Sequence, residues 1–170
     1  LGIKVFCKLH TKKSKHRSDG DSWRQELYSG LLDKDKIPKV LAALNSDSGV
    51  GIVLPNEHIL KITSFLGSNL ETVARLSARV GTPLCHLHNL PLVAGSMFWG
   101  RMDALVPMYL LSKQEEFESE KGQVDGTFAH ALERMFSISA DSVELSVCDM
   151  DLVAYTPESE ETDYLFANKG

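Results

Sequence analysis

Hydrophobic and polar positions change their period repeatedly along the chain. From Ile3 to Leu9 the apolar residues fall at every second position, with Lys4 and Lys8 between them, as is typical of a β-strand. Short apolar runs bounded by turn residues indicate further strands, and we expect these at Gly49–Pro55, at Leu90–Phe98 (as a strand or a strand with a loop) and at Val143–Asp149. Residues 51–55 and 92–94 are expected to lie in central strands.

Other segments carry apolar residues at helical spacing, three or four positions apart. Ser22, with Gln25 three positions later, is a capping box for the first of them, and Asn69 and Gly81 are an expected start and stop for the third. The predicted helices are Trp23 to about Leu32, one from about Pro38, Asn69 to about Val80, Asp103–Leu111, and Thr127–Phe136.

The alternation of strands and helices predicts an α/β fold, a three-layer sandwich with a mixed, mostly parallel sheet. We expect one domain over residues 1–155 and an acidic tail over residues 156–170. Ligands of such sheets bind at the loops that follow the strands, so these loops are where function is sought.

Composition narrows the function class. The 170 residues carry a net charge of −5, which argues against a general nucleic-acid binder. No apolar stretch reaches the roughly 20 residues of a membrane span. The three cysteines are too few and too widely spaced for a disulfide framework, so we expect a cytoplasmic protein. A first residue of Leu1 rather than Met indicates a piece of a longer protein.

The first loop with unusual chemistry is basic. His10, Lys12, Lys13 and Ser14 follow the first strand, and ammonium, imidazole and hydroxyl groups together can hold a diphosphate. The glycine-rich cradle of a Walker loop is absent from the sequence. The alternative is an exposed, solvated basic loop.

The second loop joins glycine, aromatic and charged residues. Gly95 and Gly100 permit unusual backbone conformations, and Phe98 and Trp99 stand beside Arg101. Aromatic rings next to a charge suit stacking on a sugar, so Gly95, Ser96, Trp99 and Arg101 are candidate binding residues. The alternative is that Met97, Phe98 and Trp99 are core, and we expect at least one of them to be.

The third loop is acidic and precedes a helix. Asp125 stands at the expected helix start, where a carboxylate acts either as a cap or as a base. On the helix, His130 and Arg134 are four residues apart and share a face. An exposed network of these side chains is the alternative to a catalytic site.

Other chemical signatures in the sequence are weaker. His86 and His88 have strand spacing for two metal ligands, but a third ligand is not nearby. Two Asp-x-Asp tripeptides, Asp19–Asp21 and Asp149–Asp151, are of a kind used in nucleotide-sugar chemistry. Such short acidic pairs are common by chance.

Three strings in the three loops give the chain a family resemblance. Lys8-Leu-His-Thr-Lys-Lys-Ser14, Ala94-Gly-Ser-Met-Phe-Trp-Gly-Arg101 and Gly122-Gln-Val-Asp-Gly-Thr-Phe-Ala-His-Ala-Leu-Glu-Arg134 resemble the rhamnan synthesis protein F family of bacterial glycosyltransferases. Trp23-Arg24 and Gly51–Pro55 match as well, and the resemblance spans about Val5 to Phe136.

The resemblance implies a GT-A-like transferase that moves a sugar, rhamnose in this family, from a nucleotide sugar to a polysaccharide or lipid-linked acceptor of the cell surface or lipopolysaccharide. By analogy with inverting enzymes of this type, Asp125 is the expected base, with Glu120 in reserve and then Glu118. His130 or Arg134 would orient the base or neutralise charge.

A GT-A domain also implies an earlier nucleotide-binding half that ends in a metal-holding Asp-x-Asp. Only nine residues precede His10 here, so Mg²⁺ or Mn²⁺ is expected in the full-length enzyme rather than in this chain. The implied location is the cytoplasm, with peripheral association at the inner face of the membrane. The competing function is a non-catalytic module that binds carbohydrate or docks to a partner. A phosphate-binding enzyme of another type is a third reading, and it rests on the basic loop alone.

Overall fold

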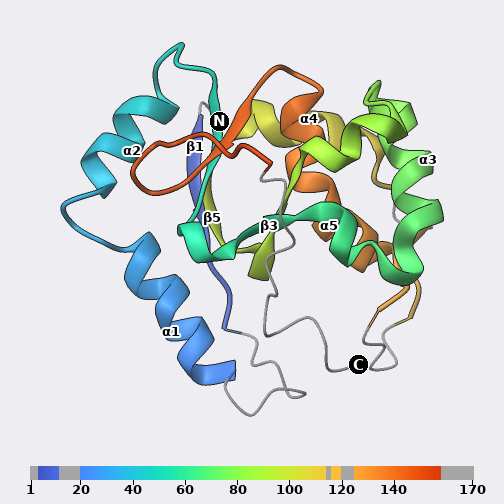
Figure 1. The fold of residues 1–170 in the computed structure, drawn as a ribbon, viewed down its shortest axis with the longest axis horizontal. Coiled ribbons are helices and arrows are strands. Elements are labelled where there is room, and N and C mark those ends of the chain that lie inside the picture. Colours follow the sequence, from blue (N-terminus) through green and yellow to red (C-terminus); the bar gives the residue numbers. More distant parts are fainter. Residues whose placement is uncertain (1–3, 12–19, 114–115, 120–124, 158–170) are drawn as a thin grey trace.

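Helices and strands alternate along the chain in the computed structural model, which describes residues 4–11, 20–113, 116–119 and 125–157 (Figure 1). The strands are β1 (Val5–Lys8), β2 (Val50–Val53), β3 (Ile59–Lys61), β4 (Pro91–Val93), β5 (Phe98–Arg101) and β6 (Ser146–Cys148). The α-helices are α1 (Gly20–Leu31), α2 (Ile37–Leu44), α3 (Leu70–Val80), α4 (Met102–Leu111) and α5 (Phe128–Asp141).

The main sheet has the order β1-β5-β2-β6. Strand β5 runs antiparallel to both β1 and β2, and β2 pairs in parallel with β6. Strands β1, β2 and β6 therefore run in one direction, and their carboxyl ends share one edge of the sheet. Helices α1 and α2 lie on one side of the sheet, and α3, α4 and α5 lie on the other (Figure 1), which confirms the mixed α/β sandwich. The sheet is not mostly parallel as expected, because two of its three strand pairings are antiparallel.

The segment 90–98 divides between two sheets. Its first part, β4, pairs with β3 in a separate two-stranded sheet, and β5 belongs to the main sheet. The expectation that residues 92–94 lie in a central strand is therefore wrong. The reason is a turn: Gly95 has φ 75° and Ser96 has φ 53°, and two successive left-handed residues redirect the chain. The expected central position is confirmed for residues 51–53, which lie in β2, whereas Leu54 and Pro55 follow the strand.

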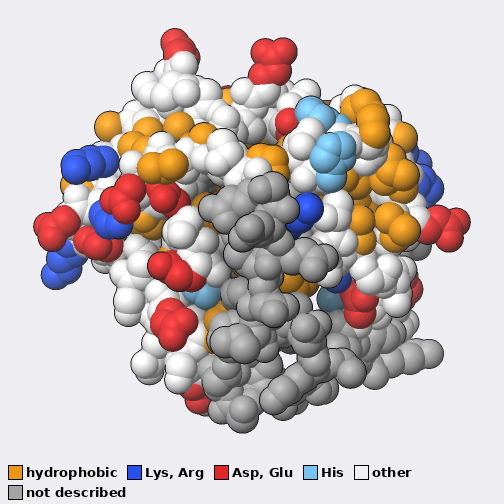
Figure 2. All heavy atoms as spheres, viewed as in Figure 1, with side chains coloured by type: hydrophobic (Ala, Val, Ile, Leu, Met, Phe, Trp, Pro, Cys, Tyr) orange, Lys and Arg blue, Asp and Glu red, His pale blue; other side chains and the backbone are white. Residues whose placement is uncertain are grey.

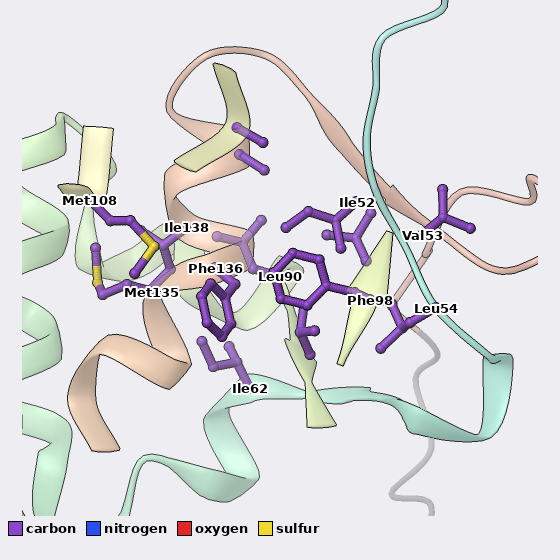
Figure 3. Packing of buried hydrophobic residues seen from close by; sticks show 14 of the residues in the cluster. Ile52, Val53, Leu54, Ile62, Leu90, Phe98, Met108, Met135, Phe136 and Ile138 are labelled. Carbon is purple, nitrogen blue, oxygen red and sulfur yellow. The ribbon is translucent and has the colours of Figure 1, made fainter. Parts of the chain in front are cut away.

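One hydrophobic core joins the sheet to the helices behind it. The rings of Phe98 on β5 and Phe136 on α5 lie 4.9 Å apart between centroids, and Ile52, Ile62 and Leu90 surround them (Figure 3). Phe98 and Ile52 are completely buried. Because Phe136 is locked into this core, α5 is held against the sheet, and with it the polar residues at its start.

Three helix boundaries differ from or refine the expectations. Helix α1 begins at Gly20, so Ser22 lies inside it and is not its cap. Helix α5 continues to Asp141, past the expected end at Phe136, because its last turns bury serine as well as apolar residues. The Oγ atom of Ser139 accepts a hydrogen bond from the backbone N–H of Met108. Gly81, with φ 89°, ends α3 as expected.

None of the helices in the described ranges is long and apolar enough to cross a membrane.

Candidate functional site

The end of β1 is joined to the turn before β5 by two side chains. The Nζ atom of Lys8 donates to the carbonyl of Ser96 at 2.6 Å, and Nε2 of His10 lies 2.8 Å from the carbonyl oxygen of Gly95. A carbonyl can only accept, so this ring nitrogen carries the proton. The hydroxyl of Tyr28 on α1 donates to the backbone carbonyl of His10 at 2.7 Å. The first residue of the basic loop and the start of the second loop are thus in contact. Lys12, Lys13 and Ser14 lie outside the described residues.

The turn itself is packed under α1. A Cβ atom added to Gly95 would lie 2.4 Å from Cη2 of Trp23 and 2.8 Å from Cδ1 of Leu27, so only glycine fits. Ser96 is 5% exposed. Both predicted binding residues therefore supply backbone that the protein's own side chains already cover.

The aromatic residues that follow divide between core and surface. Met97 and Phe98 are fully buried, which confirms that at least one residue of this segment is core. Trp99 is half-buried, and its indole N–H donates to the carbonyl of Leu31 at 2.8 Å. Arg101 lies at the far end of β5, opposite Val5 rather than Lys8, and donates to the carbonyl of Ser46. Arg101 is thus separated from the Gly95 turn by the length of the strand.

Asp125 is held by three donors. Its Oδ1 accepts from the guanidinium of Arg134 at 3.0 Å and, in a short hydrogen bond, from the side-chain amide of Asn69. Its Oδ2 accepts from the backbone N–H of Ser68 at 3.2 Å. Ser68 and Asn69 belong to a 3₁₀ turn, Gly67–Asn69, that runs directly into α3. The carboxylate therefore sits at the amino end of α3, where the helix dipole favours negative charge.

Arg134 ties the same region together. Its guanidinium also donates to the carbonyls of Phe65 at 2.6 Å and His130 at 2.7 Å, and the side chain is only 14% exposed. Arg134 thus donates hydrogen bonds to Asp125 and to two backbone carbonyls. The Asp125 side chain keeps 35% of its surface exposed, so one face of the carboxylate remains open.

The cap of α5 is Thr127 and not Asp125. The Oγ1 atom of Thr127 accepts from the backbone N–H of His130 at 3.4 Å and forms a second hydrogen bond, 2.7 Å long, with Nδ1 of that ring. The interpretation of Asp125 as the cap of its own helix is therefore wrong, since Asp125 lies two residues before the cap and turns to α3 instead. An Asn at position 125 would not simply take over its hydrogen bonds, because an amide offers one acceptor oxygen in place of two.

Glu118 also contributes to the start of α5. Its Oε2 accepts from the backbone N–H of Phe128 at 2.9 Å. This hydrogen bond is the main reason that the pKa of Glu118 lies below its ordinary value, and the nearby charge of His130 adds to it. A carboxylate engaged at a helix start is better explained as a cap than as a base. Glu120 lies outside the described residues.

Helix α5 lies close to Lys8 through Phe136 and Glu133, and it contacts Asp125 through Arg134. The Lys8 ammonium lies 5.7 Å from the centroid of the Phe136 ring, and the charge of Glu133 acts on Lys8. His130 and Arg134 contact Thr127 and Asp125. The contacts of Gly95 are with β1 and α1, and those of Asp125 are with the start of α3 and with α5. A cleft shared by Asp125 with Gly95, Ser96 and Trp99 stays a prediction.

The second Asp-x-Asp tripeptide lines a separate cavity of about 240 Å³, at the carboxyl ends of β2 and β6. The Oδ1 atom of Asp149 accepts from the backbone N–H groups of Asp151 and Val153, and Asp151 forms an ion pair with Lys36 at 2.7 Å. Acidic and basic side chains mix in this way across the face that carries α2 (Figure 2). One oxygen of each carboxylate is therefore engaged, and among the described residues no third His, Cys, Asp or Glu side chain joins the two as a metal ligand.

The remaining metal candidates are similarly occupied or incomplete. Asp21 pairs with Arg24 on α1, and Asp19 lies outside the described residues. His86 lies 3.4 Å from Asp141 at the surface. The described part of the chain contains no group of three His, Cys, Asp or Glu side chains that could hold a metal ion.

Sequence reasoning missed several residues of the candidate site. Ser68 and Asn69 contact Asp125 from more than fifty positions away, and the Asn69 side chain does not cap α3 as expected. Trp23 and Tyr28 cover the Gly95 turn. Lys8 carried a signal, a charged residue in an otherwise apolar strand two positions before His10, but alternation does not show which groups its side chain meets.

Comparison with known proteins gives a consistent picture. The family model described as rhamnan synthesis protein F matches residues 3–143. Two proteins from two strains of Xanthomonas campestris pv. campestris, both called uncharacterized protein WxcX, are 40% and 39% identical to the chain over 138 residues. The match covers 81% of this chain and 20% of each relative, so the chain spans about a fifth of their length. No solved structure matches the chain significantly.

Proposed function

The chain belongs to the rhamnan synthesis protein F family, and we propose on that premise that it is a glycosyltransferase domain. It would transfer a sugar, rhamnose in the first instance, from a nucleotide sugar to a growing cell-surface polysaccharide or lipopolysaccharide. The family description ties the chain to polysaccharide synthesis. The reaction, donor and acceptor are the proposed part.

The contact between His10 and Gly95 carries the proposal. It brings the start of the basic loop against the turn that leads into Trp99, at the edge where the carboxyl ends of β1, β2 and β6 meet. Ligands of α/β sheets bind at this edge. Lys12, Lys13 and Ser14 would hold the diphosphate of the donor there, and the half-buried Trp99 would stack on a sugar.

Asp125 is the proposed base. The acceptor hydroxyl oxygen would attack the anomeric carbon, the bond from that carbon to the diphosphate oxygen would break, and the hydroxyl proton would pass to Asp125. An ionised carboxylate has about four lone-pair positions, and three are occupied by Asn69, Arg134 and Ser68. The remaining position and the exposed face suit an acceptor hydroxyl. Arg134 orients the carboxylate, and His130 stands beside it.

Magnesium or manganese enters no step of this mechanism. The described residues bring together no three His, Cys, Asp or Glu side chains that could hold such an ion, so we propose that the metal of the full-length enzyme is held outside the described residues. The inner face of the cytoplasmic membrane is the proposed location, because a lipid-linked acceptor would be found there.

A non-catalytic module that binds the acceptor polysaccharide is the second candidate. Two observations favour it. The chain covers only 20% of its relatives, and Asp125 has more hydrogen bonds than a base needs. Such a module would bind oligosaccharide and not nucleotide sugar.

Calorimetric titration of the chain separates these candidates. The ligands are dTDP- and GDP-linked sugars, with and without Mg²⁺ or Mn²⁺, and rhamnose oligosaccharides. The double variant Lys12→Ala/Lys13→Ala should lose at least about tenfold in nucleotide-sugar affinity, because charged hydrogen bonds contribute about 1.5–3 kcal/mol. The control Lys34→Ala/Lys39→Ala removes equal charge from exposed positions at α2 and should bind normally. Binding of oligosaccharide alone would favour the module.

A further inference from the structure

The turn between β4 and β5 has a backbone conformation that its sequence alone would not hold. Gly95 and Ser96 are consecutive residues with φ of 75° and 53°. Glycine adopts this conformation readily, but serine does so rarely. A non-glycine residue in the left-handed region persists when its surroundings over-determine it. The question is which groups do so.

Lys8 and His10 are those groups. Lys8 is the last residue of β1 and His10 follows two positions later, and both side chains reach the same turn. Each binds one of the two successive carbonyls, Lys8 that of Ser96 and His10 that of Gly95. We call this pair of side chains the turn clamp. The Trp23 ring closes the other side of the turn, against the Cα atom of Gly95.

The environment of Lys8 is unusual for a lysine. Burial lowers the pKa of Lys8, and the charge of Glu133 partly offsets the effect. The side chain lies over the Phe136 ring, although lysines ordinarily keep their ammonium group in water. A lysine that merely covered a strand could extend into solvent. This one gives up hydration to bind a carbonyl.

We propose that Lys8 and His10 are positioning residues, which fix the left-handed Gly95–Ser96 turn and so set where β5 and Trp99 lie relative to the start of the basic loop. In this clamp the partner of Lys8 is the backbone carbonyl of Ser96. It is not the phosphate that a basic residue beside the basic loop suggests. Its consequence for sugar transfer rests on the proposed function. Its effect on the turn does not.

Amide hydrogen exchange of residues 95–99 tests the clamp directly. Lys8→Met keeps an unbranched side chain and removes the donors, and Lys8→Arg restores a donor. Lys4→Met is the matched control, since Lys4 is an exposed lysine just before β1. We expect Lys8→Met to speed exchange in this segment about tenfold, with α3 unchanged. Lys8→Arg should return exchange close to wild type, and Lys4→Met should have no effect.

Tryptophan fluorescence is an independent readout. The two tryptophans of the chain are Trp23, which touches Gly95, and Trp99, three residues after Ser96. The emission spectrum should shift in Lys8→Met and return in Lys8→Arg. If Lys8→Met does not fold, His10→Phe, which lacks a donor, is compared with His10→Gln, which keeps one. The same pattern of loss and rescue is expected.

The outcomes separate the clamp from the proposed function. Wild-type exchange and fluorescence in Lys8→Met, or a Lys8→Arg variant as perturbed as Lys8→Met, would overturn the clamp even if nucleotide sugar binds. Faster exchange with rescue by arginine would support the clamp, even in a chain that binds no nucleotide sugar.

Discussion

Two of the three strings that carried the family resemblance have different roles in the folded chain. In residues 94–101 the polar backbone groups are bound by Lys8 and His10, and the apolar side chains fill the core. In residues 125–134 the Asp125 carboxylate binds Asn69 and Arg134 but keeps a third of its surface open. The first string mainly builds a scaffold. The second presents charge at the surface.

The difference lies in where the partners come from. The Gly95 turn is covered by segments that fold around it, α1 and the end of β1, so its chemistry is directed inward. Asp125 connects the starts of two helices, α3 and α5, where backbone N–H groups lack partners within the helix. A carboxylate at such a junction is oriented without being enclosed. A distinctive sequence string therefore marks a region with a defined arrangement. Whether its side chains point into the core or to the surface then distinguishes a structural role from a chemical one.

The largest expected effect is at the scaffold. Gly95→Ala would place a methyl group 2.4 Å from the Trp23 ring in a left-handed backbone, and we expect a loss of at least about 3 kcal/mol in the free energy of unfolding. Gly81→Ala is the control, because Gly81 has φ 89° and no atom within 4 Å. That variant should lose only about 1 kcal/mol. Urea denaturation measures both. Equal losses would mean that the turn is not packed under Trp23.

A second pair of variants compares the charged region with an ordinary surface ion pair. Arg134→Met removes three hydrogen bonds from a side chain that is 14% exposed, and we expect a loss of about 2 kcal/mol. Arg75→Met breaks an ion pair of the same 3.0 Å length, with Glu116, but the Arg75 side chain is 48% exposed. We expect less than about 1 kcal/mol there. Thermal unfolding of the two variants checks the difference, and similar melting temperatures would contradict the anchoring role of Arg134.

The sequence predicted elements better than it predicted contacts. Strand β2 was found from its short apolar run, and α5 from its amphipathic spacing. The end of α5 was missed because Ser137 and Ser139 are buried although they are polar. The continuous hydrophobicity of segment 90–98 predicts a strand, or a strand with a loop, but it does not show that the two parts belong to different sheets. The hydrophobic pattern cannot reveal the left-handed turn at Gly95 and Ser96.

The candidate site was predicted only in part, for a related reason. His10 and Gly95 were each singled out, but the hydrogen bond between them depends on β1 and β5 being neighbours in the sheet. The partners of Asp125 come from a turn before α3 that no local pattern connects to α5. Local sequence fixes which side chains are available, and tertiary packing fixes which of them meet.

The smallest expected effect is a pH dependence at Glu118. The pKa of Glu118 is lowered in the folded chain from its ordinary value of 4.5, so its carboxylate stabilises the fold above that value. This contribution is lost as pH falls through the lower, folded-state pKa. Wild type should therefore melt slightly above Glu118→Gln at neutral pH, and the two should converge in acid. Glu26→Gln, an exposed carboxylate on α1, is the control, and a gap that widens in acid would contradict the assignment.

Transfer by the complete protein, measured with nucleotide-linked rhamnose and an oligosaccharide acceptor, tests the central claim most directly. Asp125→Asn and Asn69→Ala each weaken the same anchor, but only the first removes the proposed base. After correction for the folded fraction, we expect Asp125→Asn to transfer about 10²- to 10⁴-fold more slowly. Asn69→Ala, which keeps the base and removes one of its hydrogen bonds, should slow transfer far less. A folded Asp125→Asn protein with wild-type turnover would remove Asp125 from the mechanism, and a wild-type protein that transfers no sugar would contradict the proposed function itself.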